Sequence, residues 1–124
     1  MSRKVVDASA ILAVLLDEPE SELVSRRLDG HDLAAPLLLV FEVLNTCAVK
    51  TKKYPAKRDT FVRALQAFRR FDVFLEEIDP EEVFDLALRH KLTGYDASYL
   101  WLSKQMDAEL VTLDAELIAA IAAP

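Results

Sequence analysis

Short apolar runs alternate with longer segments of helical periodicity along the chain. The short runs predict buried strands at residues 4–7, 33–35, 73–75 and 110–113. The longer segments predict helices at residues 9–16, 18–29, 36–53, 55–70, 80–91, 96–106 and 114–122. Strands that alternate with helices are typical of an α/β fold, so we expect a central parallel sheet of about four or five strands with helices on both faces.

Prolines and glycines mark several of the expected helix ends. Pro36 is expected to begin one helix, and Asp79 with Pro80 forms the cap and first position of another. Gly30 and Gly94 are expected to mark helix ends, because glycine readily takes the left-handed conformation that closes a helix.

Composition excludes several classes of protein. The 124 residues fit one domain, and 52% of them are hydrophobic, which is enough for a substantial core. There is no run of about eighteen apolar residues, and Asp7 interrupts any leader-like segment, so we expect neither a spanning helix nor export. Cys47 is the only cysteine, which excludes an internal disulfide and favours a cytoplasmic protein. Two glycines are too few for a phosphate-binding glycine loop.

The formal net charge of −6 is distributed unevenly. Residues 50–70 carry a surplus of +7, and the other residues together carry −13. A total this acidic does not favour nucleic-acid binding, but the basic segment provides a local surface for it. The five basic residues that we single out as candidate RNA contacts are Lys50, Lys52, Lys53, Lys57 and Arg58. The alternative is that the segment forms two solvated helix faces.

Four acids stand at positions where chemistry is expected in a parallel sheet. Asp7 ends the first predicted strand and Asp114 ends the last, so both are expected at one edge of the sheet. Asp96 begins a helix after Gly94, and Glu42 interrupts the apolar run at residues 37–44. A carboxylate among so many apolar side chains needs a cation or hydrogen-bond donors.

Each acid also has an ordinary explanation. Asp7, Asp96 and Asp114 all precede helices, where aspartate is a favoured N-cap. Glu42 could form an ion pair with a lysine from residues 50–53. If all four meet, their repulsion demands positive charge, and an all-carboxylate site selects a hard ion, Mg²⁺ or Mn²⁺. Such an ion can activate water and stabilise the charge that develops on a phosphate.

Three polar residues are candidate supports for these acids. Asn45 lies one helical turn after Glu42, where it could hold a metal-bound water or an acid, or form only a local hydrogen bond. Ser9 could donate to a metal ligand, but a helix cap is the more ordinary role. Thr112 is first of all a strand residue.

These residues, in this order, resemble the PIN-domain ribonucleases, and more narrowly the VapC toxins of bacteria and archaea. The similarity is carried by four segments: residues 5–10, residues 36–45, residues 95–100 and residues 110–114. It implies a PIN-like three-layer sandwich and a metal-dependent endoribonuclease that uses Mg²⁺ or Mn²⁺. It also implies an acidic pocket of Asp7, Glu42, Asp96 and Asp114, a homodimer, and an antitoxin whose tail covers the site.

Two other functions remain open from the sequence. A signalling receiver domain has a similar length and acids at strand ends, but it requires a pair of acids after the first strand and a lysine at the end of the last. In this chain Asp7 stands alone after the first predicted strand, and Asp114 ends the last. A PIN-like fold kept only for binding a partner is the other alternative. Phe61, Leu65 and Phe68 recur at helical spacing and are expected in the core. Tyr99, Trp101 and Leu102 follow Asp96 and are also expected in the core, although an aromatic ring near the pocket could stack on a base. The apolar run at residues 37–44 could bury a dimer interface or lie inside the fold.

Overall fold

The structure is a computed structural model that describes residues 2–123. Its strands are β1 (Arg3–Val6), β2 (Asp32–Pro36), β3 (Val73–Glu76) and β4 (Glu109–Val111). Its helices are α1 (Ala8–Leu15), α2 (Ser21–Leu28), α3 (Leu38–Lys53), α4 (Arg58–Phe68), α5 (Pro80–His90), α6 (Gly94–Gln105) and α7 (Ala115–Ala122), with a 3-10 turn, η1 (Pro55–Lys57). The predicted alternation of strands and helices is confirmed.

The four strands form one parallel sheet in the order β3-β2-β1-β4. The central strand β1 pairs with β2 on one side and with β4 on the other, so that Val5 faces Ala34 and Leu110. The chain therefore moves in one direction from β1 to β3 and then crosses back to β4. Ligands of open parallel sheets bind beyond the carboxyl ends of the strands where the order reverses, which here is beside β1 and β4.

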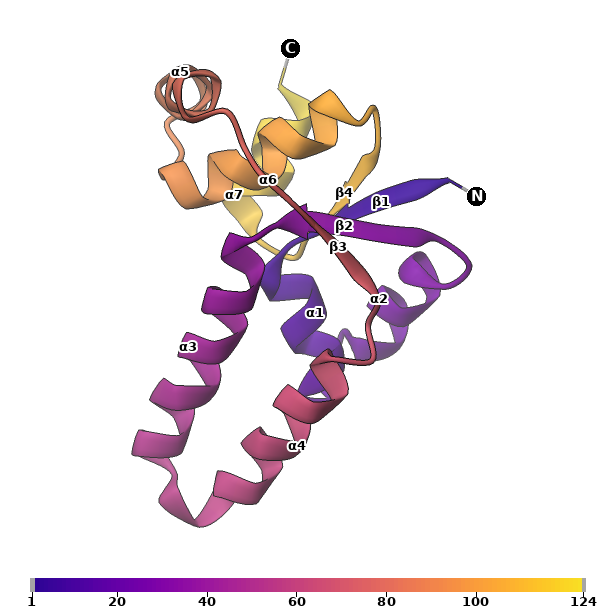
Figure 1. Cartoon of the computed structure of the whole chain (residues 1–124), viewed down its shortest axis with the longest axis vertical. Helices are drawn as coiled ribbons and strands as arrows, with labels where there is room; N and C mark the ends of the chain where they lie inside the picture. The colour runs from indigo at the N-terminus through magenta and orange to yellow at the C-terminus, as the bar shows by residue number, and fades with distance from the viewer. Residues whose placement is uncertain (1, 124) are drawn as a thin grey trace.

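Helices cover both faces of the sheet (Figure 1). Helices α1 to α4 lie on one face, and α5, α6 and α7 lie on the other. This division follows from right-handed crossovers, because a reversal of direction in the sheet places the connecting helices on the opposite face. Val5 and Val6 of β1 are completely buried, together with Leu39 of α3, and Tyr99 of α6 is almost completely buried. The predicted three-layer α/β sandwich with a central parallel sheet is confirmed.

Several helix ends differ from the prediction. Pro36 ends β2, and α3 begins two residues later at Leu38. Gly94 is the first residue of α6, and the left-handed position after α5 is taken by Lys91, with φ of 55°. A lysine in this conformation is uncommon, so the sequence carried no signal for it.

The apolar run at residues 37–44 is divided between the core and the surface. Leu39 and Val43 are buried, whereas Leu37, Phe41 and Leu44 are exposed. Helix α3 then extends away from the sheet and pairs with α4 in a long hairpin, whose tip lies farthest from the sheet (Figure 1). Among the expected core aromatics, Phe61 is buried, and Phe68 is partly buried against the main core. No helix among residues 2–123 is long and apolar enough to cross a membrane.

Candidate active site

The four acids singled out from the sequence lie together at the carboxyl ends of the strands. Asp7 follows β1 directly, and Asp114 follows β4 by three residues. Glu42 reaches the same place from α3, which begins where β2 ends, and Asp96 reaches it from the first turn of α6. The negative charges of Asp114, Glu42 and Asp7 all act on Asp96, so one electrostatic cluster is formed from four separate segments.

Asp7 is held rigidly by donors from two elements. Its side chain is only 4% exposed. Oδ1 accepts a hydrogen bond from the Ser9 hydroxyl at 2.7 Å and from the Ala10 backbone N–H at 3.0 Å. Oδ2 accepts one from the Thr112 hydroxyl at 2.5 Å. This fixes the orientation of the carboxylate and ties the end of β1 to the end of β4.

Asp7 and Asp114 each cap a helix and also belong to the group of acids. Asp7 is the N-cap of α1 and Asp114 is the N-cap of α7, where it accepts the Leu117 N–H at 3.0 Å. The alternative that Ser9 caps α1 is wrong, because Ser9 lies inside α1 and donates to Asp7. The capping explanation of Asp96 is also wrong, since the N-cap of α6 is Thr93. The Asp96 carboxylate has no capping role and lies beside the positive end of the α6 dipole.

Thr112 and Ser9 connect the two strand ends. The Thr112 hydroxyl donates to Asp7 and accepts the Asp114 backbone N–H at 3.0 Å. The Ser9 hydroxyl accepts the Leu113 backbone N–H at 2.9 Å. The expectation that Thr112 belongs to a strand is wrong, because it lies one residue beyond the end of β4. It is 3% exposed, and its hydroxyl positions Asp7 and Asp114.

A fifth acid, Glu116, joins this group and was not singled out from the sequence. Carboxylate oxygens of Asp96, Asp114 and Glu116 lie within 4.8 Å of one another. Glu116 is the second residue of α7, two positions after Asp114. Its only sequence signal is an acid in the first turn of a helix, which is too common to indicate a site. Hereafter the acid cluster means Asp7, Glu42, Asp96, Asp114 and Glu116.

Glu42 is partnered by a tyrosine from the opposite layer. The Tyr99 hydroxyl donates to Glu42 Oε1 at 2.5 Å. Tyr99 is 1% exposed, so its expected place in the core is confirmed, but the hydroxyl gives it a polar role that helical periodicity could not reveal. Burial and the Glu42 carboxylate raise the pKa of Tyr99, which keeps its hydroxyl protonated as a donor.

Among the residues that the structure describes, no basic side chain forms an ion pair with the acid cluster. Within residues 2–123, ion pairs join Lys4 and Arg27 to Glu109 and Arg26 to Glu22, and none involves the acid cluster. The proposed alternative of an ion pair between Glu42 and a lysine from residues 50–53 is therefore wrong.

Burial and mutual repulsion shift Asp7, Glu42 and Asp96 toward their protonated forms. Burial raises the pKa of Asp7, against the opposing effect of its hydrogen bonds. Burial also raises the pKa of Glu42, with a smaller contribution from the charge of Asp7. Burial, followed by the charges of Asp114, Glu42, Asp7 and Glu116, raises the pKa of Asp96 from an ordinary value of 3.8 to about 6. A bound cation would relieve this mutual repulsion.

A family model for the PIN domain matches residues 4–123. The chain belongs to the PIN-domain family. Ribonuclease VapC3 of Pyrobaculum aerophilum is 33% identical over 118 residues, which cover 91% of this chain and 90% of the relative. Ribonuclease VapC9 of Mycobacterium tuberculosis is 33% identical over 120 residues, covering 91% of this chain and 87% of the relative. This similarity extends over nearly the whole length of each protein and identifies a PIN domain of the VapC kind.

A solved structure supports the same assignment. The crystal structure of PAE2754 from Pyrobaculum aerophilum superposes on this PIN domain with a TM-score of 0.78 and 29% sequence identity. The match covers 96% of this chain and 84% of the other. The resemblance to the PIN-domain and VapC proteins is therefore confirmed.

The chemistry of the donor set in this PIN domain fits a hard divalent cation. Every candidate ligand is a carboxylate oxygen, and three of these oxygens are close enough to contact one ion. Neither histidine belongs to the acid cluster, and Cys47 is buried elsewhere, against Phe61 and Ala64. A site made only of oxygen ligands favours Mg²⁺ or Mn²⁺ over softer metals.

Asn45 and the basic residues lie outside the acid cluster. Asn45 is exposed on α3, and within residues 2–123 it makes no hydrogen bond to a cluster acid. Lys50, Lys52 and Lys53 lie in the last turn of α3, and Lys57 and Arg58 lie at the junction of η1 with α4. The structure thus places the candidate RNA contacts at the hairpin tip and not around the acids.

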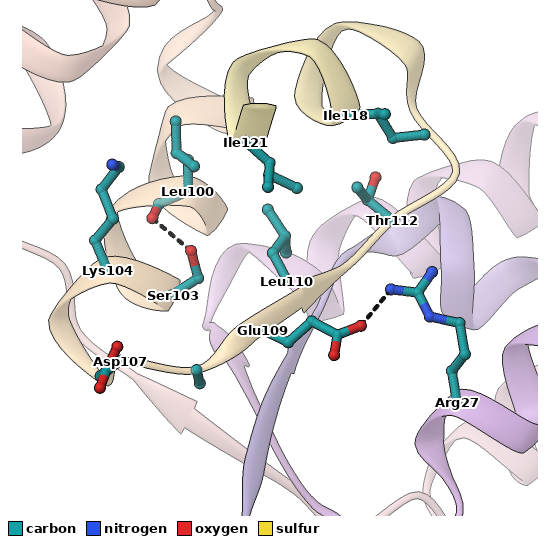
Figure 2. A pocket seen from close by; sticks show the side chains of 11 residues that line it. Arg27, Leu100, Ser103, Lys104, Asp107, Glu109, Leu110, Thr112, Ile118 and Ile121 are labelled. Carbon is teal, nitrogen blue, oxygen red and sulfur yellow. Dashed lines mark hydrogen bonds and ion pairs between the residues drawn. The ribbon is translucent and has the colours of Figure 1, made fainter. Parts of the chain in front are cut away.

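A cavity of about 690 Å³ runs along β4 in this PIN domain and is separate from the acid cluster (Figure 2). It is lined by Leu110, Ile118 and Ile121, and the ion pair of Arg27 with Glu109 closes one side. No member of the acid cluster lines it. Its size alone therefore does not make it the site of chemistry.

Replacing Tyr99 by phenylalanine is expected to destabilise the metal-free protein by about 1 kcal/mol, because Glu42 loses its donor while the packed ring is kept. Since protonation of Glu42 removes the charge that needs this donor, the loss should shrink as the pH falls through the raised pKa of Glu42. Urea denaturation in EDTA at neutral and acidic pH measures both effects. Tyr95→Phe is the matched control, because Tyr95 is exposed. Equal losses for the two variants would contradict the role given to Tyr99.

Proposed function

We propose that this PIN domain is a metal-dependent endoribonuclease that hydrolyses RNA phosphodiester bonds, and that it is the toxin of a toxin–antitoxin pair. The observation that carries the proposal is the acid cluster, with five carboxylates at the carboxyl ends of parallel strands and no ion pair to a basic side chain within residues 2–123. The relatives bear the name ribonuclease, which supports RNA as the substrate. Membership of the PIN-domain family argues against the receiver-domain alternative.

Mg²⁺ or Mn²⁺ is the proposed cofactor. Asp96, Asp114 and Glu116 would hold it, together with Asp7 and Glu42, because these side chains offer the required oxygen ligands. A bound ion of this kind supplies activation of water and stabilisation of the negative charge that develops on the phosphate. It would also make the site attractive to a phosphodiester that the bare carboxylates repel.

The protein's own groups position this chemistry. Ser9 and Thr112 hold Asp7 in one orientation, so that the carboxylate does not have to be ordered during the reaction. Tyr99 holds Glu42 through Oε1, so the other carboxylate oxygen, Oε2, is the atom that would accept a proton from the attacking water. Asn45, on the exposed face of α3, is retained as a candidate that holds water at the rim of the site.

The toxin proposal includes an antitoxin partner and a homodimer. Leu37, Phe41 and Leu44 leave an apolar stripe exposed along α3, and Phe84 with Leu88 forms another on α5. An apolar groove of about 430 Å³ also lies between α3, α4 and β3. Exposed apolar side chains that gather on one helix face or around a groove are typical of protein–protein contact sites.

Incubation with mixed RNA tests the proposed function directly. Cleavage is expected in Mg²⁺ or Mn²⁺ and is expected to stop in EDTA. Mg²⁺ is also expected to raise the Tm in the absence of RNA, because an ion that binds only the folded state stabilises it. Cleavage that persists in EDTA would reject the metal requirement. Absence of cleavage with every divalent ion, together with binding of a protein partner, would favour the partner-binding alternative.

A further inference from the structure

The positive charge of the molecule is concentrated on one helical hairpin, which lies on the opposite side of the molecule from α5 (Figure 1). This basic hairpin comprises residues 50–70, from the last turns of α3 through η1 and α4. We propose that it is a second RNA-binding surface, which anchors the substrate by its phosphates at a distance from the acid cluster. The proposal rests on the ribonuclease function proposed above.

The cations of the basic hairpin are available for an external partner. Within residues 2–123, every ion pair lies elsewhere in the fold, on β1, α2 and β4. Seven of the eight basic side chains are exposed, and Lys50 is half-buried. Free, clustered lysines and arginines are the groups that bind nucleic-acid phosphates, and binding gains free energy from the counterions they release.

The rest of the molecule cannot supply this attraction. Residues outside the hairpin carry a combined charge of −13, and the acid cluster adds its field at the site itself. An RNA that approaches the acid cluster is therefore repelled until a metal is bound, whereas the hairpin attracts it over a long range. The surplus of +7 on residues 50–70 is the one large positive region among the segments that the structure describes.

Some cations of the hairpin are held in place by contacts within the hairpin. The ammonium groups of Lys53 and Lys57 lie 5.4 and 5.6 Å from the centre of the Tyr54 ring, so the ring holds both near the tip. Arg63 of α4 and Arg70, two residues beyond its end, line one hollow of about 420 Å³. The donors therefore form a track along the hairpin and not a single point.

A second hollow lies between the hairpin and a residue that positions Asp7. It has a volume of about 290 Å³ and is lined by Ser9, which binds Asp7, and by Thr46 and Lys50 of α3. Glu18 and Glu20 also line this hollow, and Lys50 is the one basic residue among its lining residues. The hollow thus brings the first lysine of the hairpin near Ser9, which holds Asp7.

The length of α3 sets the size of a stacked RNA strand that uses both surfaces. Glu42 and Lys53 are eleven residues apart on one helix, which corresponds to about 17 Å at 1.5 Å per residue. A strand with stacked bases advances about 3.4 Å per nucleotide, so about five nucleotides span this distance. A stacked tetranucleotide bound at the acid cluster falls short of the hairpin tip.

RNA binding without cleavage tests the proposal. The triple variant Lys52, Lys53 and Lys57→Gln removes three exposed cations and keeps residues of similar helix propensity. Its matched control, Arg89, Lys91 and Lys104→Gln, removes the same charge from α5, its cap and α6. Fluorescence anisotropy in EDTA with a labelled RNA of about 20 nucleotides, several times the span of α3, gives affinity over a series of salt concentrations.

The hairpin variant is expected to bind at least about tenfold more weakly than the control, and the slope of log affinity against log salt should fall by about 2. With Mg²⁺, the ratio of kcat/KM for the long RNA to that for a tetranucleotide should fall through a higher KM for the long RNA. Equal affinities of the two triple variants would overturn the proposal. So would a hairpin variant that keeps RNA binding but loses binding of an acidic peptide, since the surface would then serve a protein partner. If the wild-type protein binds RNA through the hairpin in EDTA but cleaves none with any divalent ion, the anchoring surface stands and the ribonuclease proposal fails.

Discussion

Replacing Asp96 by asparagine is expected to reduce metal-dependent RNA cleavage by about a thousandfold or more, while the protein still folds. Asp96 lies at the centre of the acid cluster, within reach of Asp114 and Glu116 and under the influence of Glu42 and Asp7. Asparagine keeps the shape but removes the negative charge that a divalent ion requires. Single-turnover cleavage with saturating Mg²⁺ measures the loss.

The same substitution is expected to stabilise the metal-free protein at neutral pH. The folded-state pKa of Asp96 is about 6, above its ordinary value of 3.8, so the folded state takes up a proton more readily than the unfolded state between these values. The contribution of Asp96 to stability is therefore fully present below about 3.8 and is lost as the pH rises through about 6. The Tm in EDTA should show this decline for the wild type and a smaller one for Asp96→Asn.

An exposed aspartate serves as the matched control for this variant. Asp85 lies on α5, away from the acid cluster, and Asp85→Asn should change neither cleavage nor the pH dependence of the Tm. If Asp96→Asn retained cleavage within about tenfold of the wild type, a metal ligand at this position would be excluded. If it lowered the Tm in EDTA, the carboxylate would instead have a structural partner.

Replacing Thr112 by valine is expected to lower the free energy of unfolding by about 3 kcal/mol, which is the largest stability change that we predict. Valine has nearly the same shape, so the loss comes from the hydroxyl alone. Asp7 loses a buried hydrogen bond of 2.5 Å, and the Asp114 N–H loses its acceptor. For a domain of this size the Tm should fall by about 10 °C, as measured by calorimetry.

The pH dependence of this loss identifies its origin. Thr112 lowers the raised pKa of Asp7 by donating to the charged form, so valine should raise that pKa further. The destabilisation is then largest where Asp7 is ionised and smaller as the pH falls through its pKa. Thr112→Ser keeps the hydroxyl and should lose only the methyl contribution, about 1 kcal/mol. A serine variant as unstable as the valine variant would show that packing, and not the hydroxyl, is what matters.

Local patterns identified most of the structural elements because they depend on local physics. Short apolar runs predicted all four strands, and Asp79 with Pro80 predicted the start of α5 where the structure has it. The predictions were wrong at the end of β2 and at the end of α5, where local sequence preferences did not decide the boundary. Pro36, which has no backbone N–H, ends β2, and the hydrogen bond to the Glu76 carbonyl comes from the Leu37 N–H that follows it. Lys91 takes the left-handed conformation that glycine normally occupies.

The order of strands and helices already determined that Asp7 and Asp114 would meet, because parallel strands end at one edge of a sheet. Only the tertiary structure decided which groups support the acids. Thr112 is 105 residues from Asp7, and Tyr99 is 57 residues from Glu42, yet each pair forms a hydrogen bond. A repeating pattern of apolar residues tells which side of an element faces the core, whereas the partner of a buried hydroxyl depends on how separate layers pack. The entry of Glu116 into the acid cluster and the raised pKa of Asp96 are results of that packing.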